Sequence, residues 1–172
     1  MCCCMLIIGC ASKNKIKISA DYFGYGLIAA LMHDTGYVKM LGDDLRTGAK
    51  YTFKHVARSV RYANKYLSND GLGKDTVAAI QNMIWCTCTK MNIGYIKFST
   101  RLERLIGYCL GTADIMSQMA APNYVDKLPT LYEEFKEGYE YEDIDYLKSC
   151  GYVIFNSEEE MMRKTPGFYR YW

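Results

Sequence analysis

Residues 27–32 form a continuous apolar run, Leu-Ile-Ala-Ala-Leu-Met, that leads directly into His33 and Asp34. Because the run is apolar on every side, it predicts a central helix with no face left for solvent. Thr35 and Gly36 predict the end of this helix, since glycine suits the left-handed position after a last turn. Two adjacent ionisable groups withdrawn from water must be paired, neutralised or bound to a cation. The run therefore predicts both a helical core and a candidate site at its end.

The rest of the chain also has helical rather than alternating apolar spacing, with turn signals between the segments. This pattern predicts an all-α protein, a single-domain helical bundle of about five to seven helices. In the second expected helix, the apolar positions keep a spacing of three and four from Phe53 to Leu67. The aromatic tail, residues 165–172, shows no such pattern. We expect helices over residues 16–34, 49–67, 74–87, 100–121 and 128–138, and a capped helical start at residues 157–162.

Length and composition limit the class of protein. A chain of 172 residues can bury one core. We expect residues 1–14 to be an N-terminal segment, either truncated or irregular, and residues 15–172 to be the helical domain with a C-terminal extension. The 21 basic and 19 acidic residues nearly balance, so charge indicates neither a specific nucleic acid nor a membrane as partner. The eight cysteines could form a disulfide framework, but the chain is longer than such scaffolds and has ten methionines. We therefore expect a reducing cytoplasm, with most thiols packed as small apolar groups.

His33 and Asp34 together supply an imidazole nitrogen and a carboxylate oxygen, a donor pair suited to Mn, Fe, Co, Ni or Zn. Asp114 shares a helical stripe with Gly107 and Gly111, and these glycines would let a neighbouring helix come close where the carboxylate emerges. His55 completes the candidate set.

Each of these residues also has a simpler interpretation, which the sequence leaves open. His33 alone could be a satisfied histidine near a helix end. Asp114 could bond a backbone amide or Arg104, and His55 could be half-exposed surface at the border of an amphipathic helix.

Taken together, residues 27–37 resemble the signature stretch of HD-domain proteins, a helical superfamily of metal-dependent phosphohydrolases. Residues 54–59 are similar to the second histidine segment of this family, and residues 111–114 to its final aspartate. The chain has only two histidines, and both lie where the family pattern has one. Segments 126–129, 131–135 and 163–169 resemble the tail of a subset of uncharacterised bacterial members, so the resemblance runs from about residue 20 to residue 170.

The resemblance implies hydrolysis of a phosphomonoester or nucleotide-type phosphodiester by metal-activated water. His33, Asp34 and Asp114 match the metal ligands, and Asp34 and His55 would be catalytic. The position of His55 helps to hold a second metal or contacts phosphate in various members. The cofactor would be Mn, Fe, Co, Ni, Zn or Mg, and the partner a small phosphorylated substrate, with a homodimer left open. By position in the sequence, the nearest cations for the phosphate are Lys39, Lys54 and Arg58, although each could be a solvated surface charge.

One departure from the family pattern is serious. Members usually have another metal-binding histidine before the His-Asp pair, and residues 1–32 contain none. Either the sequence starts after that helix or the ligand has been lost, unless a thiolate from Cys2, Cys3, Cys4 or Cys10 replaces it. Residues 85–87, where two-metal members often have a further histidine, are Trp-Cys-Thr. The alternatives are therefore a degenerate HD domain, acting as a non-catalytic ligand-binding or interaction module, and a structural helical protein whose aromatic tail docks on a partner.

Overall fold

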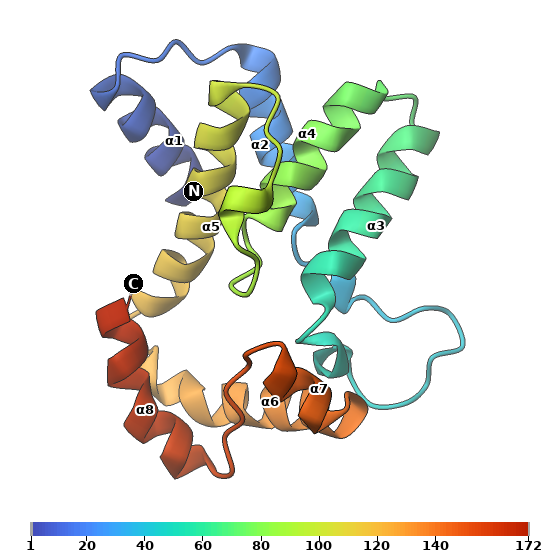
Figure 1. Ribbon diagram of the computed structural model, residues 1–172, viewed down its shortest axis with the longest axis vertical. Helices are drawn as coiled ribbons and strands as arrows, with labels where there is room; N and C mark the ends of the chain where they lie inside the picture. The colour runs from blue at the N-terminus through green and yellow to red at the C-terminus, as the bar shows by residue number, and fades with distance from the viewer. Residues whose placement is uncertain (1, 172) are drawn as a thin grey trace. The chain divides into compact units, whose positions relative to one another are not determined.

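The structure is a computed structural model that describes residues 2–171. Within these residues there are eight α-helices and four short 3-10 turns, and no strand, which confirms the all-helical class (Figure 1). The helix count exceeds the expected range because α1 (Cys2–Lys13) and the short α7 (Ile144–Ser149) were not expected.

The chain divides into two compact units. The first comprises Met1–Gly36 and Lys54–Ser117, and the second comprises Tyr37–Phe53 and Gln118–Trp172. The expected division of the chain after residue 14 stays a prediction.

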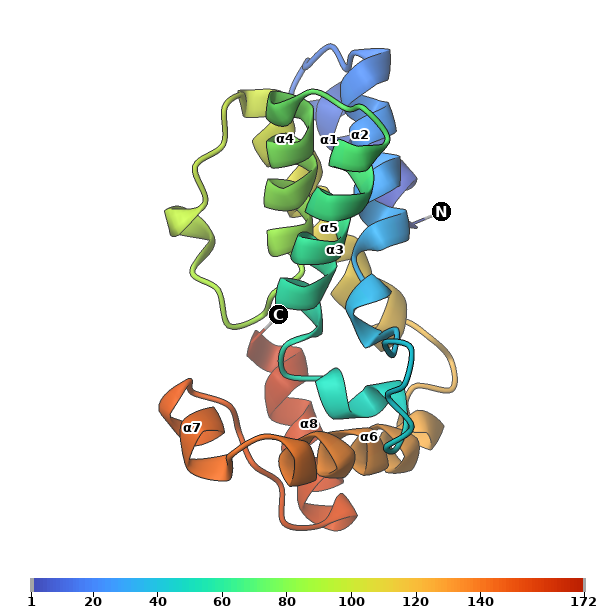
Figure 2. The same cartoon turned by 90° about the vertical axis from the view of Figure 1, so that its right-hand side faces the viewer.

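The first unit consists of α1, α2 (Ala20–Met32), α3 (His55–Asn69), α4 (Lys74–Trp85) and all but the last two residues of α5 (Arg101–Met119). Helix α4 packs against both α2 and α3 (Figure 2). Its buried side chains, among them Ile80, Met83 and Ile84, join those of α3 and α5 in one apolar core.

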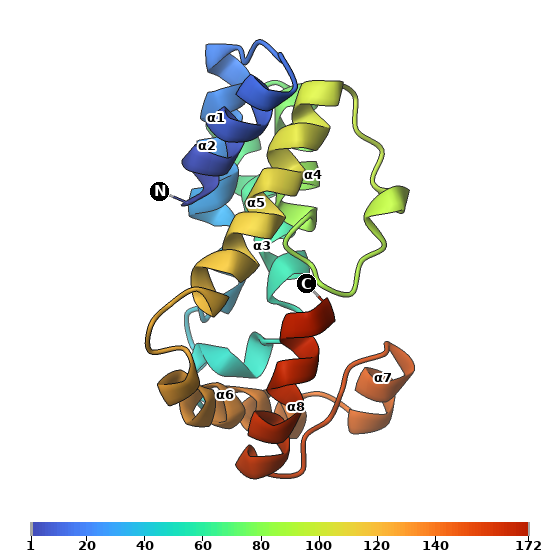
Figure 3. The same ribbon diagram turned by 90° about the vertical axis from the view of Figure 1, so that its left-hand side faces the viewer.

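Helices α1, α2 and α5 meet at Gly26 (Figure 3). A Cβ atom on Gly26 would lie 2.6 Å from a methyl carbon of Ile106 and 3.6 Å from one of Ile7. Both isoleucines are fully buried. The absence of a side chain on α2 at this point therefore lets α1 and α5 bring their core residues together.

Helix α2 differs from its prediction in two ways. It begins at Ala20 rather than at residue 16, because the Ser19 hydroxyl caps it by accepting a hydrogen bond from the Tyr22 amide at 3.3 Å. The helix is also not enclosed on every side, since Leu31 is 81% exposed and Leu27 is 40% exposed. Its buried face is made instead by Gly26, Ala29 and Met32.

The second expected helix is split in two. A 3-10 turn, η2 (Gly48–Tyr51), and α3 lie on either side of the boundary between the units. Phe53 belongs to the second unit, where its ring lies 5.3 Å from that of Tyr139 and 4.9 Å from that of Tyr152. Phe53 is therefore not part of the apolar stripe of α3, which starts at Val56.

The second unit is built on α6 (Leu128–Tyr141), which packs against η2 and against α8 (Glu158–Tyr171). The Glu137 carboxylate accepts hydrogen bonds from the amides of Thr47 and Lys50, which joins α6 to η2. Lys50 is only 1% exposed, and its ammonium pairs with Asp43 close to the ring of Tyr51.

Helix α8 starts as expected, since the Ser157 hydroxyl accepts from the Glu160 amide at 3.2 Å. It then continues to Tyr171 with Pro166 inside it, so residues 165–171, for which the sequence showed no pattern, are helical.

Nowhere in residues 2–171 does a helix have the length and apolarity needed to cross a membrane. The cytoplasmic location stays a prediction.

Candidate metal centre

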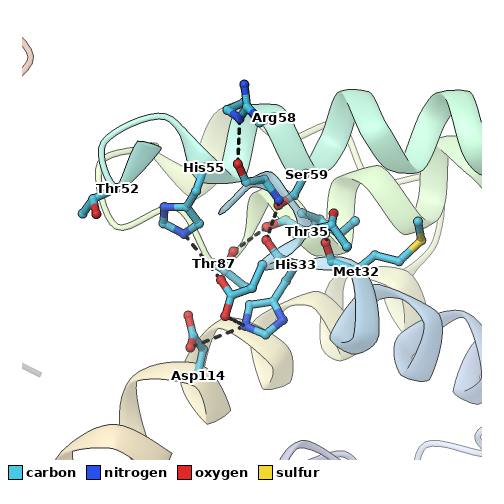
Figure 4. Close-up of polar contacts among 12 residues, drawn as sticks. Met32, His33, Thr35, Thr52, His55, Arg58, Ser59, Thr87 and Asp114 are labelled. Atoms are coloured by element: carbon cyan, nitrogen blue, oxygen red, sulfur yellow. Dashed lines mark hydrogen bonds and ion pairs between the residues drawn. The ribbon is translucent and has the colours of Figure 1, made fainter. Parts of the chain in front are cut away.

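The first unit brings the two histidines and the two candidate aspartates together (Figure 4). His33 is the C-cap of α2, His55 is the first residue of α3, and Asp114 lies on α5. Nε2 of His33 lies 3.2 Å from Oδ2 of Asp34 and 3.7 Å from Oδ1 of Asp114. Nε2 of His55 lies 3.7 Å from Oδ1 of Asp34. The Asp34 carboxylate therefore interacts with both imidazoles.

The backbone fixes which nitrogen of His33 faces the carboxylates. Nδ1 lies 2.8 Å from the carbonyl oxygen of Ala30. Since a carbonyl only accepts, this contact is a hydrogen bond only when Nδ1 carries the proton. In the neutral imidazole, Nε2 then has a free lone pair directed at the carboxylates, which is the orientation that metal-binding histidines usually have.

The charges of the cluster shift the pKa values of its members. Partial burial lowers the pKa of His33, but hydrogen bonds to Asp114 and Asp34 outweigh it, and the pKa rises to about 10. For Asp34, partial burial raises the pKa, and the interactions with His33 and His55 more than reverse this, so the pKa is lowered. In the absence of another cation, a protonated His33 therefore balances the carboxylates.

The turn that carries His33 and Asp34 is attached to α3 by Ser59, a residue that the sequence analysis did not select as functional. Ser59 is fully buried, and its hydroxyl donates to the carbonyl of His33 at 2.5 Å and accepts from the amide of Gly36 at 2.8 Å. Nε of Arg58 donates to the carbonyl of Gly36 at 2.6 Å. A serine one helical turn after His55 was the only signal in the sequence, and it cannot indicate such a bridge.

Gly36 is required for a different reason from the one expected. It is not in the left-handed conformation; among the described glycines only Gly42, Gly71 and Gly151 have positive φ. A Cβ atom on Gly36 would lie 1.9 Å from the carbonyl oxygen of His55. The glycine therefore allows the turn after α2 to approach the start of α3 closely enough for the two histidines to share Asp34.

The expectation that Gly107 and Gly111 let a neighbouring helix come close is confirmed. A Cβ atom on Gly111 would lie 2.2 Å from the carbonyl oxygen of Cys86, and one on Gly107 would lie 2.8 Å from the Cys86 sulfur. The close neighbour is the C-terminal end of α4. This packing fixes the axial position of α5, and hence of Asp114, relative to α4.

The three cations expected to contact phosphate are not equivalent. Lys54 is the N-cap residue of α3 and is half-buried, and Arg58 lies one turn further along the helix. Lys39 belongs to the second unit, where its ammonium donates to the carbonyl of Arg46 at 2.6 Å. The phosphate-binding role of all three stays a prediction.

Among the cysteines near the N-terminus, Cys3 is a poor replacement for a missing histidine. Cys3 and Cys10 pack against the apolar core of the first unit. Burial, followed by the charge of Cys4, raises the pKa of the Cys3 thiol to about 11. A thiol with such a pKa is neutral near pH 7, whereas metal binding needs the thiolate.

As arranged, no group of three or more His, Cys, Asp or Glu residues within residues 2–171 could hold a metal ion. The four side chains of the candidate site contact one another directly instead. Comparisons of this chain with protein-family models, with curated protein sequences and with solved structures find no match.

Proposed function

We propose that this chain is a metal-dependent phosphohydrolase of the HD type, in which His33, Asp34 and Asp114 bind a divalent ion. The proposal rests mainly on one observation, namely that Nε2 of His33 faces carboxylate oxygens from two separate parts of the fold. A half-buried imidazole together with two carboxylates is a suitable donor set for Mn, Fe, Co, Ni or Zn.

The distances support this donor set. Two atoms that each lie about 2.1 Å from one ion are roughly 3.0–3.5 Å apart, depending on the coordination angle. The separation of 3.2 Å between His33 and Asp34 falls within this range, and the 3.7 Å between His33 and Asp114 exceeds it slightly. The Asp114 side chain would therefore have to rotate to reach an ion shared with His33 and Asp34.

In such a site, the protein residues would have distinct tasks. When bound, the ion would supply Lewis acidity, which lowers the pKa of water and polarises a phosphoryl oxygen. His55, close to the other oxygen of Asp34, could protonate a leaving oxygen, ligate an ion or contact the phosphate. Arg58 and Lys54 would offset negative charge on the phosphoryl oxygens. The substrate class, a phosphomonoester or a nucleotide-type phosphodiester, comes from the HD resemblance alone.

The experiment combines metal binding with hydrolysis. The protein is treated with a chelator, dialysed, and titrated with Mn²⁺ in a calorimeter. Wild type, Asp114→Asn and the control Asp75→Asn are compared, because Asp75 is an exposed carboxylate of α4 outside the cluster. Hydrolysis of p-nitrophenyl phosphate, bis-p-nitrophenyl phosphate and a nucleotide panel is then measured with Mn²⁺, Ni²⁺ or Co²⁺.

We expect wild type and Asp75→Asn to bind Mn²⁺ alike and Asp114→Asn to bind it at least tenfold more weakly, with activity falling in parallel. Equal binding by all three proteins would exclude Asp114 as a ligand. Absence of Mn²⁺ binding in wild type would overturn the proposal.

A second candidate function is a non-catalytic HD-like module. It is favoured by the direct ion pairs of His33 with Asp34 and Asp114, which can balance the cluster without any metal. Binding of Mn²⁺ without turnover of any substrate in the panel would favour this module over the enzyme.

A further inference from the structure

We propose that α3 carries a binding surface for single-stranded nucleic acid, made of Arg58, Arg61, Tyr62, Lys65 and Tyr66. Binding to this α3 surface does not depend on a metal ion, and only Arg58 is shared with the candidate metal centre. Neither the apolar core nor the candidate metal centre requires Arg61, Tyr62, Lys65 or Tyr66, whereas Arg58 also donates to the carbonyl of Gly36.

The charge of α3 is strongly one-sided. Its 15 residues include three basic side chains, Arg58, Arg61 and Lys65, and no acidic one. Their spacing of three and four residues places them on one face, opposite the buried stripe of Val56, Val60, Ala63 and Leu67. Like charges at this spacing destabilise a helix, whereas a polyanion lying along the face would turn their repulsion into attraction.

The outer part of this face is open to a ligand. Arg61 and Lys65 are exposed. The Arg61 guanidinium donates to the carbonyl of Ala57 in its own helix, and within residues 2–171 neither Arg61 nor Lys65 forms an ion pair with a carboxylate.

Two tyrosines accompany the basic residues. Tyr62 and Tyr66 are 48% and 55% exposed, and their rings stack with centroids 6.0 Å apart and an interplanar angle of 17°. Proteins bind single-stranded nucleic acids with exposed aromatic rings beside a row of cations, since bases stack on the rings and phosphates contact the cations.

The position of the tyrosines also indicates the path that a bound strand would take along α3. His55 precedes Tyr62 by seven residues, or two helical turns, so it lies on the same edge of α3 as both rings. A strand stacked on Tyr66 and Tyr62 would therefore point along the helix toward the end that carries His55.

The rings distinguish the intended partner from other polyanions. In a duplex the faces of the bases are stacked on one another, so only the phosphates could bind, and an acidic protein would also engage only the cations. The balanced charge of the whole chain indicates no nucleic-acid partner, because a total cannot reveal that the cations of α3 lie on one face of a helix that has no acidic residue.

The test measures binding by fluorescence anisotropy with EDTA present, so that metal-dependent hydrolysis cannot occur. The probes are dye-labelled oligo(dT) and oligo(rU) of about 15 nucleotides and a duplex of the same length. The variants are Tyr62→Ala/Tyr66→Ala and Arg61→Ala/Lys65→Ala. The matched control is Tyr95→Ala/Lys97→Ala, which removes an exposed tyrosine and an exposed lysine from the loop between α4 and α5. Circular dichroism checks that each variant keeps its helices.

We expect wild type and the control to bind both single strands alike and the duplex more weakly. Tyr62→Ala/Tyr66→Ala should bind single strands at least about tenfold more weakly. With about three phosphate contacts, wild-type affinity should fall about twentyfold between roughly 50 and 200 mM salt, and Arg61→Ala/Lys65→Ala should reduce the slope by about 1.4. Unchanged binding after loss of both tyrosines, equal loss in the control, or preference for the duplex would overturn the proposal.

Discussion

At the scale of single residues, the Ser59 hydroxyl holds the turn that carries His33 and Asp34 against α3. It is fully buried and joins the His33 carbonyl to the Gly36 amide. Ser59→Ala would leave both backbone groups without this partner, so we expect the free energy of unfolding to fall by about 1–3 kcal/mol. Urea denaturation would measure the loss. The exposed Ser68→Ala of the same helix is the control, and an equal effect of both substitutions would contradict this role of Ser59.

The residues of the site differ in the signal that each gives in the sequence, and this difference decides which of them could be predicted. His33, Asp34, His55 and Asp114 are rare or costly residue types in helical positions, so the sequence alone indicates them as candidates. Ser59 has a common residue type, and its role depends on a backbone approach that no spacing rule encodes. The sequence thus identified the candidate ligands but not the hydrogen bonds that orient them.

At the scale of elements, the contact between the end of α4 and α5 fixes the position of α5, and hence of Asp114, along the axis of α5. Gly111→Ala would place a methyl group 2.2 Å from the Cys86 carbonyl oxygen, so the helices must separate. We expect a loss of at least about 1–3 kcal/mol of stability together with weaker Mn²⁺ binding. The control is Gly24→Ala, which meets nothing within 4 Å in α2 and should stabilise the helix by up to about 1 kcal/mol. Thermal unfolding of the two variants should therefore shift in opposite directions.

The start of α8 should be sensitive to acid. Its Glu160 carboxylate pairs with Lys164 and accepts hydrogen bonds from the backbone and side-chain nitrogens of Asn156. The interaction with Lys164, followed by those with Asn156, lowers the pKa of Glu160 to about 2. Because the folded-state pKa lies below the ordinary value of 4.5, the stabilisation is complete above that pH and is lost as the pH falls toward about 2.

NMR spectra of the Asn156 amide across this pH range would test the expectation. Wild type should lose its Asn156–Glu160 hydrogen bonds as the pH falls, and Glu160→Gln should remove this pH dependence. The exposed Glu159→Gln should behave as wild type. A pH-independent Asn156 signal in wild type would contradict the assignment.

The element boundaries show where sequence patterns stop being informative. Expected helices at residues 74–87, 100–121 and 128–138 agree closely with α4, α5 and α6, because turn residues or proline mark their ends. The expected helix at residues 49–67 begins only at His55, because Phe53 keeps the apolar spacing of α3 while packing with Tyr139 and Tyr152 in the other unit. Periodicity reports that a residue is buried, but not in which core.

At the scale of the whole molecule, the two units alternate along the chain and have separate cores. In the second unit, the buried Lys50 ammonium depends on Asp43, whose carboxylate also accepts from the Tyr51 hydroxyl. Asp43→Asn would leave a buried cation without its counter-charge, which is strongly destabilising. Its effect should be confined to the unit that contains it if the two cores open independently.

Native-state hydrogen exchange distinguishes independent opening of the two units from their opening as one cooperative body. In Asp43→Asn, we expect the exchange rates of α6 amides to rise roughly tenfold or more, while those of α3 and α4 stay as in wild type. Gly111→Ala should produce the reverse pattern, faster exchange in α4 and unchanged exchange in α6. If either substitution raised exchange equally throughout residues 2–171, the units would open as one cooperative body, and the candidate metal centre would depend on the stability of both cores rather than on that of the first unit alone.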